Sequence, residues 1–330
     1  MKRTLAACCA AHFLVDFSCA FLAFRCLDRS GSLPALLLAY NFCAFAVQMP
    51  LGLLADRWDR DGLLAAVGAL TTALAFGLTH FPWLAAVLAG LGNAAFHVGA
   101  GLETLSVSRG KAGPLGVFVS PGAVGLFCGT ALGKGETFPA WGAAMALVLI
   151  AALLLLTKQP RPRCGESAPL SLRALGLPLL GLLAVVALRS WVGMGLTFDW
   201  KTGVWAWLLV LALAAGKAAG GYAADRFGFR RTAAASLLLA AALYPLSPGS
   251  PALGVTAVFL FNMTMPLTLW ASARLLPSAR GFAFGLLTFG LFLGFLPAAF
   301  GRTLSAPMAA VWALVSLALL LPGLGKAVEP

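Results

Sequence analysis

The chain has 330 residues, of which 61% are apolar and 10% are charged. A water-soluble domain carries ~25% charged residues, so the composition excludes one and indicates an integral membrane protein. Twelve spanning helices of ~20 residues would occupy about 240 residues, which leaves no room for a nucleotide-hydrolysing domain. Most of the charged residues behind the net charge of +12 lie in short loops between apolar runs. This distribution sets membrane orientation and argues against nucleic acid as a partner.

Apolar runs separated by charged or Pro- and Gly-rich breaks predict the spanning helices. In the first half they cover residues 5–24, 33–54, 63–79, 84–107, 115–133 and 139–157. In the second half they cover residues 174–197, 201–222, 233–248, 252–273, 282–301 and 306–325. Twelve spans are therefore predicted, with ten as the alternative. The two sets predict an N-terminal six-helix bundle over 1–157, a cytoplasmic linker over 158–173 and a C-terminal six-helix bundle over 174–330.

The positive charges predict the orientation of the chain. With a cytoplasmic N-terminus, sixteen of the 23 Lys and Arg residues fall on the cytoplasmic side and five on the other side. Such a bias follows the positive-inside rule. The remaining two, Arg189 and Lys217, lie inside apolar runs. We therefore expect a multi-pass protein of the plasma membrane, a monomer with both termini in the cytoplasm.

A short motif occurs twice, 169 residues apart, after the second helix of each set. It reads GLLADRWDR in the first copy and GYAADRFGFRR in the second. Glycine near a helix end lets another helix approach closely, and aspartate there can cap a helix or form a pair across a loop. The alternative is that Asp-Arg loops only set topology. The predicted gating residues are Gly52, Asp56, Arg57, Gly221, Asp225, Arg226 and Arg230.

Both loops resemble the signature loop of the major facilitator superfamily, G-x-L-A-D-R-x-G-R-R, although the first copy has Asp59 at the position of the usual glycine. The resemblance implies an all-α integral membrane protein with twelve transmembrane helices in two pseudo-symmetric six-helix bundles. Three further stretches are similar to the fosmidomycin-resistance branch of drug exporters. They are HFLVD at residues 12–16, GNAAFH at 92–97 and GVFVSPGAVG at 116–125.

In that superfamily, helices 1, 4, 7 and 10 line a central cavity, and each of these helices carries a polar residue here. At ~1.5 Å per residue, Asp16, His97, Arg189 and Asn262 lie in the middle third of a ~30 Å hydrocarbon core. Ionisable groups at that depth cost at least ~2.5 kcal/mol each and suggest a transport pathway. Asn93 lies one turn before His97 on the same helix face. The predicted substrate-binding residues are His97, Asn93, Arg189 and Asn262, with a packing role for His97 as the alternative.

His12 and Asp16 are four residues apart and share one helix face. Burial favours a neutral carboxyl group and a nearby cation favours a charged one, so Asp16 can load and release a proton as access alternates. We expect Asp16 to carry the coupling proton, with His12 as its partner. A hydrogen bond that only fixes helix packing is the alternative.

Three other features have simpler interpretations. Glu103 and Lys217 lie near the cytoplasmic ends of their apolar runs, so we expect them at a gate or at the lipid interface. Gly125, Gly129 and Gly133 recur every four residues and predict a close helix contact. An uncompensated Arg189 should pair with an anion, which is either a protein carboxylate or the substrate.

These features predict a secondary active transporter that works by alternating access and exports a small organic solute or drug, coupled to protons. One alternative is facilitated uptake or exchange of an organic anion centred on Arg189. Another is a non-transporting membrane sensor on the same scaffold. We expect no enzyme activity, no cofactor and no metal site, because the His and acidic residues lack metal-ligand spacing. The expected partners are a small-molecule substrate, protons and the lipid bilayer.

Overall fold

A computed structural model describes residues 2–28, 32–135, 138–157 and 172–328. The first half contains α1 (Lys2–Leu22), η1 (Ala23–Leu27), α2 (Leu33–Asn41), η3 (Phe42–Ala46), α3 (Gln48–Trp58), α4 (Asp61–Ala75), η4 (Phe76–Leu78), α5 (Pro82–Ser108), α6 (Gly113–Lys134) and α7 (Ala140–Thr157). The second half contains α8 (Leu172–Gly195), α9 (Gly203–Phe227), α10 (Phe229–Leu243), η5 (Tyr244–Leu246), α11 (Pro251–Asn262), α12 (Met265–Leu275), α13 (Arg280–Ala299) and α14 (Ala306–Val328).

Eleven helical segments of the described chain are long and apolar enough to cross a membrane. Four of them join more than one helical element: α1 with η1, α2 with η3 and α3, α4 with η4, and α11 with α12. The twelfth crossing is α10 with η5, whose first turn carries Arg230 and Arg231. The predicted all-α fold with twelve transmembrane helices is confirmed. The domain limits stay a prediction, because residues 158–171 of the linker lie outside the described residues.

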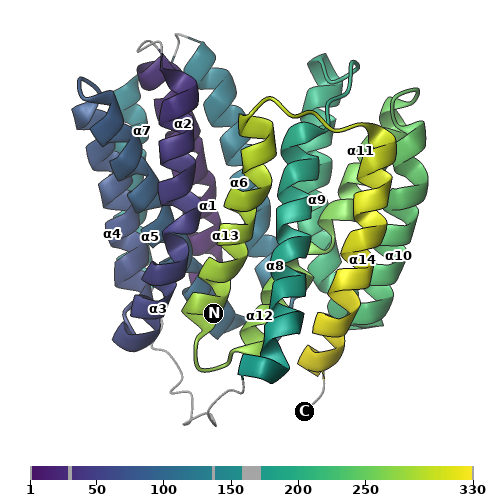
Figure 1. Cartoon of the computed structure of the whole chain (residues 1–330). Helices are drawn as coiled ribbons and strands as arrows, with labels where there is room; N and C mark the ends of the chain where they lie inside the picture. The colour runs from purple at the N-terminus through teal and green to yellow at the C-terminus, as the bar shows by residue number, and fades with distance from the viewer. Residues whose placement is uncertain (1, 29–31, 136–137, 158–171, 329–330) are drawn as a thin grey trace.

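The helices form two bundles that stand side by side, α1 to α7 in one and α8 to α14 in the other (Figure 1). Both chain ends lie toward the same end of the molecule, which we call the terminal face. The two bundles meet along two pairs of helices, α3 with α13 and α6 with α9. The 169-residue offset of the repeat relates α3 to the end of α9 and α6 to α13. The two seams are therefore equivalent under the pseudo-twofold symmetry.

Glycines let the helices inside the N-terminal bundle approach closely. A side chain added at Gly125 or Gly129 of α6 would collide with the backbone carbonyl of Phe13 or Phe17 in α1. At Gly133 it would lie 3.1 Å from the carbonyl oxygen of Phe21. The close contact that the glycine spacing predicts is therefore confirmed.

Replacing Gly129 with leucine should destabilise the fold, because the side chain would push α6 away from α1. Overpacking of this kind costs about 1–3 kcal/mol, so the thermal unfolding midpoint of the purified protein should fall by several degrees. The matched control is Gly176→Leu, since an added Cβ at Gly176 has no neighbouring atom within 4 Å. Equal melting temperatures for the two variants would contradict the packing role of Gly129.

Candidate transport site

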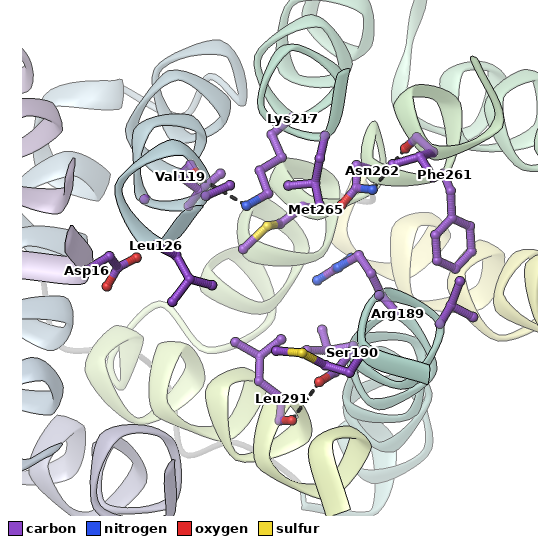
Figure 2. A pocket seen from close by; sticks show the side chains of 18 of the residues that line it. Asp16, Val119, Leu126, Arg189, Ser190, Lys217, Phe261, Asn262, Met265 and Leu291 are labelled. Atoms are coloured by element: carbon purple, nitrogen blue, oxygen red, sulfur yellow. Dashed lines mark hydrogen bonds between the residues drawn. The ribbon is translucent and has the colours of Figure 1, made fainter. Parts of the chain in front are cut away.

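A cavity of about 470 Å³ lies between the two bundles. Phenylalanine and aliphatic side chains form most of its wall, and Phe198 and Lys201 of the loop between α8 and α9 extend it toward the face opposite the termini. Figure 2 shows Asp16 on one side and Arg189, Lys217 and Asn262 facing it from the other bundle. The polar residues that line the cavity from the N-terminal bundle include His12, Asp16, Gln48 and His97, and those from the C-terminal bundle include Arg189, Ser190, Lys217, Asn262 and Thr268.

His12, Asp16 and His97 form one cluster at the side of the cavity that belongs to the N-terminal bundle. The Nε2 atoms of His12 and His97 are 3.0 Å apart. Asp16 places Oδ2 3.3 Å from Nε2 of His12 and Oδ1 3.7 Å from Nε2 of His97. The Asn93 amide donates a hydrogen bond of 3.2 Å to Oδ1 of Asp16. Helix α1 thus contributes both members of its i, i+4 pair, and α5 adds Asn93 and His97 from one face.

Among the described residues, this cluster is the one group of His, Cys and acidic side chains whose donor atoms are close enough to hold a metal ion. A tetrahedral zinc ion with ligands at 2.0–2.1 Å would set two histidine nitrogens about 3.3 Å apart. The observed separation of 3.0 Å is that of an ordinary hydrogen bond between two nitrogens. The contact between His12 and Asp16, at 3.3 Å, equals the ligand spacing of such a zinc site, so the cluster has the dimensions of a site that holds either a shared proton or a metal ion.

Arg189 is the most buried cation of the cavity, with 7% of its surface exposed. Its Nη2 donates a long bond of 3.4 Å to the hydroxyl of Thr268, and its buried Nη1 has no hydrogen-bond partner. Asn262, which is 8% exposed, donates to the carbonyl oxygen of Val258. An unpaired guanidinium nitrogen in a largely apolar cavity can donate a hydrogen bond to an anionic or carbonyl oxygen of a bound solute.

The structure places Lys217 in the same cavity, whereas sequence reasoning placed it at a gate or the lipid interface. Its Nζ donates 3.1 Å to the carbonyl oxygen of Val119 in the opposite bundle. The reason for the difference is the length of α9, which continues to Phe227, five residues beyond the predicted end of the apolar run. Lys217 is therefore ten residues from the helix end. Glu103 is also inside the fold, because only 3% of its surface is exposed.

The two repeated loops make the same kind of contact at the terminal face. Each supplies an aspartate to a helix of the other bundle. Asp56 accepts hydrogen bonds from the backbone N–H groups of Gly281 (2.7 Å) and Phe282 (2.9 Å) in the first turn of α13. Asp225 accepts bonds of 2.8 Å from the N–H groups of Ala112 and Gly113 at the start of α6. Each carboxylate also faces the positive end of a helix dipole.

Two of the predicted glycines allow this approach. A Cβ added to Gly52 would collide with the carbonyl of Gly281, and one added to Gly221 would lie 2.5 Å from the carbonyl oxygen of Ala112. Trp270 adds a third link between the bundles, which sequence reasoning missed, by donating its indole N–H to the carbonyl of Gly110 at 2.7 Å. The terminal face is therefore closed by contacts between the bundles.

The arginines of the repeated loops lie at the surface. Arg57, Arg226 and Arg230 are exposed. The guanidinium of Arg226 lies over the ring of Phe227, 5.7 Å from its centroid, and that of Arg230 touches Gly325 in the last turn of α14. The structure thus brings the Gly and Asp residues of each loop into contact with the other bundle.

The first loop keeps its aspartate contact in spite of its departure from the signature. Asp59 adopts a left-handed backbone conformation with φ of 45°, and Gly228, at the equivalent place in the second loop, has φ of 94°. Glycine adopts positive φ most easily, and aspartate is among the other residues that tolerate the left-handed region. Asp59 therefore ends α3 in the left-handed helical region with ψ of 40°, whereas Gly228 has ψ of 146° and lies in a different region that strongly favours glycine. The bonds from Gly281 and Phe282 of α13 to Asp56 are present in this loop.

Comparison with known proteins identifies the fold. No protein-family model matches the chain, and neither does any curated protein sequence. Among solved structures, a variant of the E. coli fucose:proton symporter FucP is similar with a TM-score of 0.67 and 15% identity, over 99% of this chain and 98% of that one. The human organic anion transporter MFSD10 (TETRAN) has a TM-score of 0.68 and 14% identity, over 97% and 98%.

A third similar structure is a bacterial homologue of the human lysosomal transporter Spinster, with a TM-score of 0.54 and 15% identity over 99% of this chain and 94% of that one. FucP is described as a transporter of the major facilitator superfamily. The chain therefore has the major facilitator fold. The three similar structures are named as a symporter, a transporter and a homologue of a transporter.

If the two aspartates close one gate, loss of either should loosen both contacts. In Asp56→Ala or Asp225→Ala, hydrogen–deuterium exchange should rise about tenfold in the peptides covering 110–116 and 279–285, because each charged hydrogen bond is worth about 1.5–3 kcal/mol. Asp199→Ala, an exposed aspartate near the opposite face, is the control. Faster exchange only at the helix that lost its own cap would show two independent caps instead of a gate.

Proposed function

We propose that the protein is a secondary active transporter that moves a small organic solute through the cavity between its bundles by alternating access. The supporting observation is that one cavity is lined by His12, Asp16 and His97 from the first bundle and by the cations Arg189 and Lys217 from the second. Polar groups at this depth are costly and are typical of substrate and ion pathways. The fold provides the two pseudo-symmetric halves that such a mechanism needs.

The cavity is closed at one end and extends toward the other, as expected of one state in an alternating-access cycle. The bonds from Asp56 and Asp225 close the terminal face, while the cavity reaches the loop between α8 and α9 near the other face. The positive charge of the terminal-face loops supports placing that face in the cytoplasm. Opening it requires both carboxylates to leave their helix ends, which the rocking of one bundle against the other would do.

We further propose that transport is coupled to protons at His12 and Asp16 and that its direction is export. The His12–Asp16 contact of 3.3 Å at the cavity wall supports coupling, because the pair can change its protonation while access alternates. The similarity of residues 12–16, 92–97 and 116–125 to the fosmidomycin-resistance branch supports export of a drug-like solute. Protons that enter the cell down their gradient would then drive the solute out of it.

The proposed coupling predicts that Asp16→Asn abolishes gradient-driven transport. A growth-inhibition panel that includes fosmidomycin, run in cells with and without the protein, selects the compound. Everted vesicles then measure its uptake with and without a pH gradient. The wild type should show gradient-dependent uptake and Asp16→Asn less than a tenth of it, whereas Asp59→Asn, an exposed aspartate of the terminal face, should match the wild type. Full gradient-driven uptake by Asp16→Asn would reject proton coupling.

The second candidate function is facilitated uptake or exchange of an organic anion, and the state of Arg189 favours it. Among the described residues, neither Arg189 nor Lys217 forms an ion pair with a carboxylate, and Nη1 of Arg189 has no partner. A carboxylate, phosphonate or sulfonate group could accept from both side chains while an apolar body contacts the phenylalanines of the wall.

Under this second function, Arg189→Gln and Lys217→Gln should each weaken binding of salicylate or fosmidomycin at least tenfold, a loss of about 1.4 kcal/mol. Isothermal titration calorimetry of the purified protein measures the change. Arg302→Gln, an exposed arginine outside the cavity, is the control and should bind as the wild type does. The anion function also predicts uptake that is independent of a pH gradient, in contrast to the first proposal.

A further inference from the structure

The ring orientations of His12 and His97 determine where a proton can reside in the cluster. Nδ1 of His12 lies 2.7 Å from the carbonyl oxygen of Phe118, and Nδ1 of His97 lies 2.9 Å from the carbonyl oxygen of Asn93. A carbonyl oxygen only accepts hydrogen bonds, so each Nδ1 must carry the hydrogen. Because a neutral imidazole has a single N–H, both Nε2 atoms of the neutral rings would be bare acceptors.

Two bare acceptors do not form a stable contact at hydrogen-bond distance. The two Nε2 atoms nevertheless face each other at 3.0 Å, with ring planes at 89° to each other. One additional proton between them turns this contact into an N–H···N hydrogen bond and makes the pair a single cation. The Asp16 carboxylate, next to both Nε2 atoms, supplies the balancing negative charge.

From this geometry we infer that the coupling proton is shared between Nε2 of His12 and Nε2 of His97, while Asp16 stays ionised as their counter-ion. The inference rests on the proposed proton coupling and assigns His97 to the proton site, not to the substrate site. The amide of Asn93 supports an ionised Asp16, because it donates its N–H to the carboxylate. The loaded cluster is then neutral, and release of the proton leaves one net negative charge.

The surroundings connect the proton site to the cationic side of the cavity. Pro121 lies inside α6 and lacks the N–H that would bond to the carbonyl of Val117. The carbonyls of Val117, Phe118 and Val119 accept hydrogen bonds from side chains of α1 and α9. Phe118 accepts from His12 and Val119 accepts from Lys217, so the two sites share adjacent peptide groups. Release of the proton leaves facing lone pairs that must separate, and a shift of His12 would move the turn that also holds Lys217.

The other titratable groups that face the cluster come from three elements. Cys19 lies on the same helix as Asp16, Tyr40 lies on α2, and Lys217 lies on α9. Lys217 is the cation among them, and it is already bonded to Val119. Helix α6 presents the backbone of Phe118 and Gly122, where an added Cβ would collide with both His12 and Asp16.

Nuclear magnetic resonance of ¹⁵N-histidine in the full chain, reconstituted in nanodiscs, tests the inference directly. The chain has three histidines, and the exposed His80 can be replaced by glutamine to leave the two of interest. Between pH 5 and 9, we expect both Nδ1 atoms to remain protonated and the two rings to take up one proton together. Asp16→Asn should move the midpoint of this proton uptake about one pH unit lower, a tenfold loss of proton affinity, because the counter-ion is removed.

The variants His97→Gln and His12→Gln are the second measurement, with folding checked by thermal unfolding. Each should abolish the shared step and leave the remaining histidine with a separate titration. A bare Nδ1 on either ring, uptake of the proton by ¹³C-labelled Asp16 instead of the rings, or stoichiometric zinc in the purified protein would overturn the inference. Since vesicle transport is measured separately, proton-driven uptake with the proton on Asp16 would reject this inference and leave the proposed function intact.

Discussion

Each bundle supplies one carboxylate to the first turn of a helix in the other, and these contacts close one face of the molecule. Asp56 reaches α13 and Asp225 reaches α6, and in both cases the unsatisfied N–H groups of a helix start receive a charged acceptor. The same contact brings the backbones together at Gly52 and Gly221. With the terminal face closed in this way, the bundles enclose a cavity that reaches the opposite face.

The cavity separates charge between the two bundles. The histidines and Asp16 belong to the first bundle, and Arg189 and Lys217 belong to the second. Charged groups without partners are costly in a low-dielectric interior, and Nη1 of Arg189 has none among the described residues. The carbonyls of Phe118 and Val119 in α6 touch both sides. A change at one site therefore has a short structural route to the other.

Much of this arrangement was predictable because helical periodicity and membrane thickness leave few choices. A polar residue in the middle of an apolar run must face the interior, so Asp16, His97, Arg189 and Asn262 could be placed at the cavity wall. Lys217 was misplaced because the charged end of α9 hid five more helical residues. The link from Trp270 to Gly110 has no sequence signal, since a tryptophan near a helix end is equally typical of a lipid interface.

The sequence by itself determined the number of spans, the two repeated loops and the residue types at each depth, because these follow from local hydropathy and spacing. Only the tertiary structure decided which atoms meet. The acceptors of the two Nδ1 atoms, the 3.0 Å contact between the Nε2 atoms and the free Nη1 of Arg189 depend on how helices from distant parts of the chain pack. A one-dimensional pattern gives a helix face, but a hydrogen bond requires the position and rotation of two helices at once.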